Sequence, residues 1–204
     1  MSFDNWRKYD DLHLDPVLNA AVGAFNETGY HGASVRDIAR RAGLSVPGMY
    51  HHFASKQDML VGILNLTMED LLARSRAAKD EAGDDPVRSF ALLVENLVLF
   101  HCHRRDLAFI GGSEMRSLVA NNRQRIAAMR TAQQRMVDLE VEAASAAGLF
   151  HVEHTRDASR AVVTMCVAVP TWYRFDDEET PEQLAEQYVD FGLGLMRYSG
   201  VRPR

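Results

Sequence analysis

Small, polar and basic side chains that suit contact with DNA are concentrated in one stretch of the chain, Ser34–Lys56. Small residues at Val46, Pro47 and Gly48 let a backbone come close to base edges and to a thymine methyl group. Hydroxyl, imidazole and ammonium groups in the same stretch can reach phosphates. The residues that we predict to contact DNA are Ser34, Arg36, Ser45, Val46, Pro47, Gly48, Tyr50, His51 and Lys56.

Two short helices must position these side chains, and capping residues stand at both expected starts. Ser34 precedes Asp37 by three residues, so its hydroxyl can accept a free backbone N–H while the carboxylate lies near the positive helix end. Gly43 is expected to end the first helix, because glycine adopts the left-handed conformation at little cost. Ser45 then caps a second helix that tolerates Pro47 in its first turn. This pattern predicts a helix-turn-helix, and the alternative is a plain pair of surface helices.

The stretch from Val17 to Leu60 resembles the TetR family of bacterial transcriptional regulators. It departs from the family at Val46–Met49, where many members carry a small residue, Gly, Thr or Ser, then an aliphatic residue. This departure bears on which bases are read and not on the fold. The residues that carry the resemblance are Ala20, Ala21, Phe25, Gly29, Tyr30, Ser34, Val35, Asp37, Ile38, Ala39, Ala42, Gly43, Leu44, Ser45, Tyr50, His52, Phe53, Ser55 and Lys56.

The charge distribution fits a local contact with DNA better than the total charge does. The chain has 204 residues, 47% of them apolar, and a net charge of -5. Between residues 30 and 56, however, three arginines and Lys56 are opposed by Asp37 alone. We therefore expect a modest, strongly salt-dependent attraction to DNA.

The first fifteen residues are polar and have two interpretations. They form either a frayed end or an arm whose Arg7 and Lys8 approach DNA phosphates or the minor groove. This segment lacks the apolar core of a signal peptide, and the chain has no run of about 18 apolar residues to cross a bilayer. Together with two cysteines in apolar contexts, Cys102 and Cys166, these features predict a cytoplasmic protein that does not associate with a membrane.

The rest of the chain has helical periodicity and no alternating strand pattern, so we predict an all-α fold of about nine helices. Breaks are expected at Gly111-Gly112 and at Asn121-Asn122. The stretch from Thr155 to Phe175 is apolar on all sides, which predicts a helix buried on more than one side and kinked at Pro170. We place a helix-turn-helix DNA-binding domain at 1–60 and a larger ligand-binding and dimerisation domain at 61–204.

Neither a metal site nor an active site is predicted. His101, Cys102 and His103 are adjacent, and neighbouring helical residues point about 100° apart, so the three cannot converge on one ion. The chain also lacks a nucleophile elbow and a phosphate-binding glycine loop. We therefore predict a protein that is not an enzyme and that needs no cofactor.

The family resemblance implies what the larger domain does. It implies a homodimer formed by Thr155–Phe175 and Pro181–Tyr198, and a repressor that leaves a palindromic operator when a small hydrophobic effector binds. The stretch ending in Trp172-Tyr173-Arg174 resembles actinobacterial members that respond to lipid or steroid acyl-CoA thioesters, although Trp172 can instead pack in an interface. An alternative is a helical ligand-binding or interaction protein without DNA binding. The predicted ligand-binding residues are Phe100, Met115, Arg116, Arg123, Met165, Trp172 and Arg174.

Overall fold

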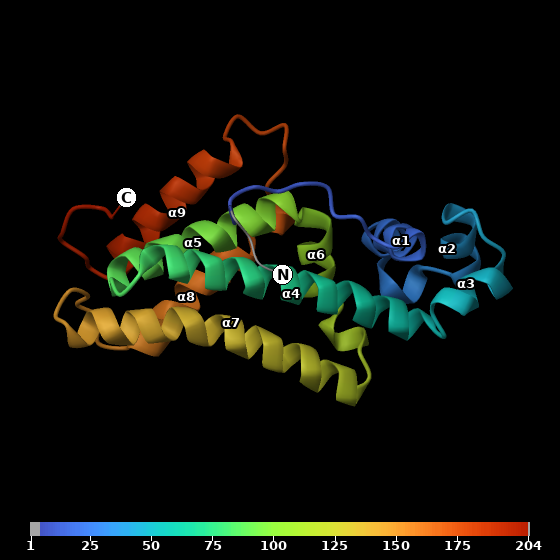
Figure 1. The fold of residues 1–204 in the computed structure, drawn as a ribbon, viewed down its shortest axis with the longest axis horizontal. Coiled ribbons are helices and arrows are strands. Elements are labelled where there is room, and N and C mark those ends of the chain that lie inside the picture. The colour runs from blue at the N-terminus through green and yellow to red at the C-terminus, as the bar shows by residue number, and fades with distance from the viewer. Residues whose placement is uncertain (1–4, 204) are drawn as a thin grey trace. The chain divides into compact units, whose positions relative to one another are not determined.

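The computed structural model describes residues 5–203, and within this range the chain forms nine α-helices, two 3-10 turns and no strand (Figure 1). The predicted all-α fold is therefore confirmed. None of these helices has both the length and the hydrophobicity that crossing a bilayer requires. The elements are α1 (Pro16–Gly32), α2 (Val35–Arg41), α3 (Val46–His52), α4 (Lys56–Ala82), α5 (Pro86–His103), α6 (Arg105–Ser113), η1 (Met115–Ser117), α7 (Ala120–Ala146), α8 (Thr155–Val167), η2 (Val169–Thr171) and α9 (Pro181–Leu195).

The chain divides into two compact units. The head unit comprises Asp10–Glu69 and Asp106–Ala128, and the body comprises the residues up to Tyr9, Asp70–Arg105 and those from Met129 onward. Helices α4 and α7 contribute residues to both. The domain boundary after residue 60 stays a prediction.

The head unit is built on α1, which packs against α2. Val17, Phe25 and Ile38 are almost fully buried, and Met49 fixes α3 on the same core. Gly29 interrupts α1 with a φ of 70°, as expected for a helix-ending glycine. The backbone N–H of Ala33 donates to the carbonyl of Gly29 at 3.0 Å.

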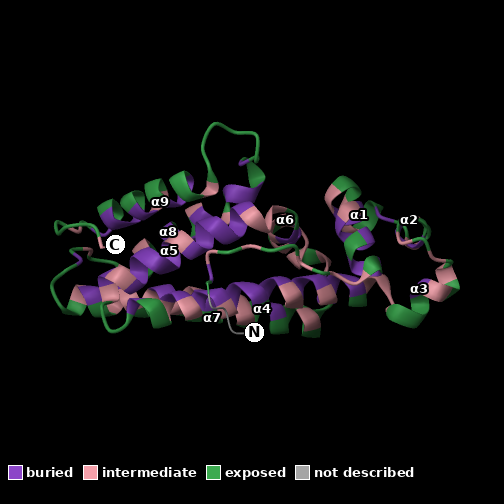
Figure 2. Cartoon of the chain, turned by 45° about the horizontal axis from the view of Figure 1, so that its top comes forward, coloured by how far each residue is buried: buried purple, intermediate pink, exposed green. Residues whose placement is uncertain are grey.

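The body is built around α5, which is buried along almost its whole length (Figure 2). It packs against α8 and α9. Gly192 of α9 is buried, and a Cβ there would lie 3.2 Å from the Phe90 ring, so this glycine permits close packing of α9 on α5. Asp85 and Thr180 cap α5 and α9, each accepting hydrogen bonds from backbone N–H groups in the first turn.

The two helix breaks that the sequence predicts, at Gly111-Gly112 and at Asn121-Asn122, were wrong. Gly111-Gly112 lies inside α6, and Asn121-Asn122 lies in the first turn of α7. Neither glycine has a positive φ, so both keep the backbone conformation of a helix. Helix propensity is a weak preference that tertiary packing overrides.

Helix α8 is shorter than the sequence predicts. It ends at Val167 and continues into the 3-10 turn η2, which contains Pro170. The missing N–H of Pro170 prevents a continuous α-helix, so the expected kink is instead a helix end. In the single chain Val162 and Cys166 are buried, whereas Ala161 and Thr164 are exposed. Burial on a second side stays a prediction, because it depends on the expected dimer.

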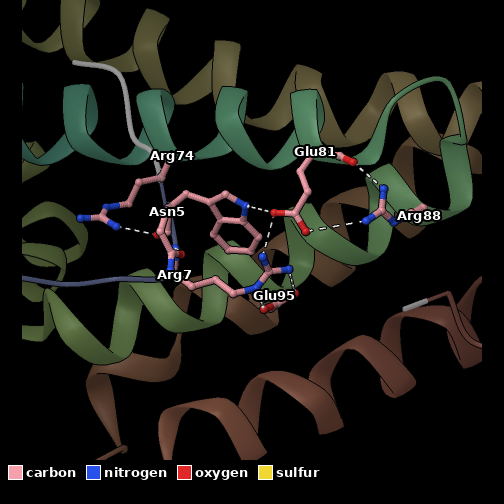
Figure 3. Close-up of polar contacts among 7 residues, drawn as sticks. Asn5, Arg7, Arg74, Glu81, Arg88 and Glu95 are labelled. Atoms are coloured by element: carbon pink, nitrogen blue, oxygen red, sulfur yellow. Dashed lines mark hydrogen bonds and ion pairs between the residues drawn. The ribbon is translucent and has the colours of Figure 1, made fainter.

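The N-terminal segment docks on the body at Trp6 and Arg7, so these two residues are neither frayed nor available to DNA, whereas a DNA contact by Lys8 stays a prediction. Trp6 is 3% exposed and donates its indole N–H to Glu81 at 2.7 Å. Arg7 bonds the same carboxylate at 2.8 Å and also pairs with Glu95 (Figure 3). The Arg7 guanidinium is thus engaged by two carboxylates of its own chain. Residues 1–4 lie outside the described range.

A buried ion pair holds the end of this segment. Asp70 and Arg74, one turn apart on α4, pair at 2.8 Å with both side chains 3% exposed. Arg74 also donates to the carbonyl of Trp6 at 2.6 Å, and Arg104 contacts the other Asp70 oxygen at 3.2 Å. The carboxylate therefore balances arginines from α4 and the end of α5.

We expect Asp70→Ala to lower the free energy of unfolding by about 3 kcal/mol, because it leaves buried guanidinium charge without its carboxylate. Urea denaturation measures the change. The matched control is Asp190→Ala, since the Asp190 side chain is 59% exposed and pairs with Arg202 at 3.1 Å; it should change stability by no more than about 0.5 kcal/mol. Equal effects of the two substitutions would contradict the assigned role of Asp70.

Candidate nucleic-acid interface

Helix α2 begins where its cap predicts. The Ser34 hydroxyl accepts the backbone N–H of Asp37 at 3.1 Å, and Ser34 itself has an extended backbone. Ile38 and Ala39 are buried, so one face of α2 packs on the head unit. The cap and the buried face together fix the direction of α2.

The turn between α2 and α3 depends on Gly43. Its φ is 69°, and nothing lies within 4 Å of the place where a Cβ would be, so the backbone angle alone favours glycine there. The N–H of Leu44 bonds the carbonyl of Ala39 at 2.9 Å, and the N–H of Gly43 bonds that of Arg40 at 3.2 Å. These two bonds form a Schellman motif, which satisfies the last carbonyls of α2.

Helix α3 is short and is held from both ends. Ser45 caps it by accepting the N–H of Gly48 at 3.1 Å, and Pro47 lies in the first turn. A Cβ on Gly48 would lie only 3.2 Å from the Ser45 hydroxyl oxygen. His52, at the other end, lies 3.3 Å from the Asp15 carboxylate that caps α1. Both predicted helix starts are confirmed.

Most of the predicted DNA-contacting residues are accessible. Val46 and Gly48 are half-buried, and Lys56 is discussed below. Their contact with DNA stays a prediction. The exposed members of the set are Ser34, Arg36, Ser45, Pro47, Tyr50 and His51.

Two of the three nearby arginines are paired within the chain. Asp37 pairs with Arg40 and, at 2.7 Å, with Arg41, which also binds both carboxylate oxygens of Glu27. Hydrogen bonds from the arginines lower the pKa of Asp37, and those from the two carboxylates raise the pKa of Arg41. Among residues 5–203, Arg36 forms no ion pair and so keeps its charge available for a phosphate.

Lys56 has an unexpected set of partners. Its Nζ donates to the carbonyls of Tyr30 at 2.6 Å and Ala33 at 2.8 Å, and it lies 4.4 Å from the centre of the Tyr30 ring. The ammonium thus joins the start of α4 to the end of α1, where the helix dipole favours a positive charge. Burial lowers its pKa. A phosphate contact by Lys56 stays a prediction.

The predicted ligand-binding residues are divided between the units. Met115, Arg116 and Arg123 belong to the head unit, where Met115 is half-buried and both arginines are exposed. The remaining four, Phe100, Met165, Trp172 and Arg174, belong to the body.

Of the four in the body, two flank Tyr173 in sequence. Phe100 is 1% exposed, whereas Trp172 is 46% exposed with its ring edge-on to that of Tyr173. Arg174 is exposed, and its guanidinium bonds the Tyr173 carbonyl at 3.0 Å. A role of these residues in ligand binding stays a prediction.

The histidines and cysteine at the end of α5 have separate surroundings. The His101 imidazole is buried and lies 2.6 Å from the carbonyl of Leu97, and burial lowers its pKa to about 4. The His103 ring instead stacks on Tyr9, with centroids 4.4 Å apart. Cys102 is buried, and burial raises the pKa of its thiol to about 12, so it stays protonated at neutral pH.

The sequence reasoning missed three buried polar residues in the body, Ser75, Asn96 and Gln133, which bond one another from α4, α5 and α7. Glu95 and Asn96 together interrupt the apolar run of α5, and the polar pair was the available signal.

Two capped helices joined by a glycine turn, with small and polar side chains exposed on the second, define a helix-turn-helix DNA-binding protein. Comparison with known families agrees. The model of the bacterial regulatory proteins of the tetR family matches residues 17–63, and a tetracyclin repressor-like C-terminal domain matches residues 83–196. The chain belongs to the TetR family of transcriptional regulators and is not an enzyme.

Similar proteins extend over nearly the whole chain. The transcriptional repressor KstR2 of Mycobacterium tuberculosis is 29% identical over 188 residues, which cover 91% of this chain and 93% of KstR2. A solved tetR-family regulatory protein from Rhodococcus RHA1 has a TM-score of 0.84 and 25% identity, covering 91% of this chain and 97% of that one. The fold is also that of AibR, solved in complex with isovaleryl coenzyme A and operator DNA, with a TM-score of 0.78, 23% identity, and coverage of 86% and 95%.

We expect Lys56→Met to lower the free energy of unfolding by about 1–2 kcal/mol, because two backbone carbonyls lose a charged donor at a partly solvated site. Chemical denaturation followed by circular dichroism measures this change. Arg76→Met is the control for loss of a positive charge, because Arg76 is exposed and forms no ion pair among residues 5–203; it should change stability by no more than about 0.5 kcal/mol. Unchanged stability of Lys56→Met would contradict the joining role of Lys56.

Proposed function

We propose that this protein is a repressor that binds a palindromic operator as a homodimer and is released by a small hydrophobic effector. The observation that carries the proposal is the exposed side of α3, where Pro47, Tyr50 and His51 are accessible on a helix fixed by Ser45 and Met49. A two-fold dimer places two such helices in successive major grooves of a palindrome. A regulator of chromosomal genes acts in the cytoplasm, and that location is part of the proposal.

Side-chain chemistry suggests which residues of the proposed DNA interface contact phosphates and which contact bases. Arg36 and Tyr50 contact phosphates, because an unpaired guanidinium and a phenol suit backbone oxygens. Val46 and Pro47 face base edges and thymine methyl groups, because they are small and apolar. Gly48 permits the close approach.

The proposed dimer face is formed by Thr155–Phe175 and Pro181–Tyr198. Phe191 is 57% exposed and Leu195 39% exposed on α9. On α8, Ala161 and Thr164 are exposed opposite the buried Val162 and Cys166. Apolar surface of this kind is what a dimer interface covers.

The proposed effector is an acyl-CoA or steroid-CoA thioester. Support comes from AibR, whose solved complex contains isovaleryl coenzyme A, and from the likeness to KstR2, which is named a ketosteroid regulator in its solved structure. Exposed arginines at Arg116, Arg123 and Arg174 suit an anionic phosphate group. The effector releases DNA only if it binds the non-binding conformation more tightly.

The DNA contacts predict two kinds of variant. Arg36→Ala should weaken binding to all sequences and reduce the slope of log K against log salt by about one, because one phosphate contact is lost. Pro47→Ala should instead change which sequence is preferred, with little change in that slope. Fluorescence anisotropy on the promoter region upstream of the protein's own gene measures both.

The control for these measurements is Arg76→Ala, an exposed arginine of α4 in the body, which should leave binding unchanged. If Arg36→Ala and Pro47→Ala had the same effect on affinity for every sequence, the separate roles assigned to phosphate-contacting and base-contacting residues would be wrong. No binding to the promoter region by the wild type would favour a ligand-binding or interaction protein without DNA binding.

Calorimetry with long-chain and steroid CoA esters tests the effector. We expect the thioesters to bind and to release operator DNA, and the corresponding free acids to bind more weakly because they lack the phosphate groups. Two variants are compared, Arg174→Ala in the body and Arg116→Ala, Arg123→Ala in the head unit, and the one that removes the phosphate contact should lose this difference. Binding of the free acids alone would show that the CoA group is wrong.

A further inference from the structure

Three buried polar side chains from three helices meet inside the body. Ser75 of α4 and Asn96 of α5 are both 0% exposed, and Gln133 of α7 is 4% exposed. Asn96 Nδ2 donates to the Ser75 hydroxyl oxygen at 2.8 Å, and Gln133 Oε1 lies 2.9 Å from the same oxygen. We call these three residues the amide cluster.

The amide cluster has more hydrogen-bonding groups than its members can satisfy. Asn96 Oδ1 and Gln133 Nε2 are buried and have no partner in the described part of the chain. Ser75 has one hydroxyl hydrogen, yet both the Leu71 carbonyl, at 2.8 Å, and Gln133 Oε1 lie within its reach. Its hydrogen can satisfy only one of these acceptors.

Exchanging the nitrogen and oxygen positions of the amides does not remove the deficit. If the Gln133 amide is turned so that Nε2 donates to the Ser75 hydroxyl oxygen, the Ser75 hydroxyl donates to the Leu71 carbonyl and Gln133 Oε1 has no partner. If the Asn96 amide is turned instead, Asn96 Nδ2 no longer donates to the Ser75 hydroxyl oxygen. In every arrangement one polar atom of Asn96 and one of Gln133 remain buried without a hydrogen bond.

The fold does not require this polarity. A buried polar group without a partner destabilises a protein more than a hydrogen bond formed there would stabilise it. Ser75 alone is satisfied by the Leu71 carbonyl of its own helix. On the side of α5 that carries Asn96, the residues one turn away, Leu93 and Phe100, are apolar and at most 1% exposed. Leucine and methionine at positions 96 and 133 would avoid the deficit.

We infer that the amide cluster binds an oxygen atom on the otherwise apolar part of the effector, a hydroxyl or a ketone. Asn96 and Gln133 offer the ligand one free acceptor and one free donor, and a hydroxyl oxygen can both donate and accept. A site with unpaired polar groups rejects a ligand that lacks the matching group, because binding then leaves those groups unsatisfied. The preferred effector is therefore an oxygenated acyl chain or ring system rather than a plain hydrocarbon. This inference rests on the proposed effector-binding function of the body.

The test compares matched ligands by calorimetry on the full-length wild-type protein. The probes are dodecanoyl-CoA and dodecanoic acid, each against analogues that carry a hydroxyl or ketone group at successive positions along the chain. We expect at least one oxygenated probe to bind about ten-fold or more tightly than its plain counterpart, since one hydrogen-bonded pair is gained. The same probe should release operator DNA at lower concentration.

Two variants locate the effect. Asn96→Leu and Gln133→Met lie on different helices, so one serves if the other fails to fold. Each should reduce the preference for the oxygenated probe to less than about three-fold and leave the unliganded Tm unchanged or higher, because an unpaired group is removed. The matched control is Ser145→Ala on α7, whose hydroxyl is also buried and unpaired but lies outside the amide cluster; it should keep the preference.

The outcomes separate this inference from the proposed function. If plain and oxygenated thioesters bind equally and release DNA equally, the proposed effector function holds, but the amide cluster does not recognise an oxygen atom of the effector. If only the free acids bind, but the oxygenated ones bind more tightly, the CoA group is wrong and the inference holds. The inference is overturned if no oxygenated probe binds more tightly than its counterpart. It is also overturned if both variants lower the unliganded Tm by more than about 4 °C, because the amides are then structural.

Discussion

Burial of α5 on nearly all sides is the constraint on which the body depends. A helix that gives up almost all contact with water must satisfy or neutralise every polar group it carries. His101 does so by losing its proton, since burial lowers its pKa to about 4, and by bonding the Leu97 carbonyl. Asn96 does so only in part. Helix α5 packs against both α8 and α9, so it is the common support of the two elements of the proposed dimer face.

The head unit shows a second constraint, which is electrostatic. Arg40 and Arg41 are positively charged residues next to the turn, but Asp37 and Glu27 engage them within the chain. Counting basic residues in the sequence therefore overstates the charge that DNA meets. In the proposed homodimer, simultaneous contact by two subunits would supply the affinity, because a subunit with little free positive charge neutralises few phosphates.

The sequence predicted the short-range features well and the long-range ones poorly, for a physical reason. Helix caps depend on residues three positions apart, so Ser34 and Ser45 identified their helix starts. The docking of Trp6 on Glu81 joins residues 75 positions apart, and the bonds of Lys56 to the end of α1 join residues 23 and 26 positions apart. No periodicity reports such pairs. The break predicted at Gly111-Gly112 was wrong because low helix propensity is a weak preference that the rest of the structure can override.

The contact between Gly48 and its cap has a consequence for substitution. A Cβ at position 48 would lie 3.2 Å from the Ser45 hydroxyl oxygen that starts α3, so a larger residue there requires a small shift of that hydroxyl. Many members of the family carry threonine or serine at this position, and such a residue would adjust the helix start together with any contact to DNA. The geometry of one cap thereby links the choice of residue at position 48 to the direction of the helix that carries it.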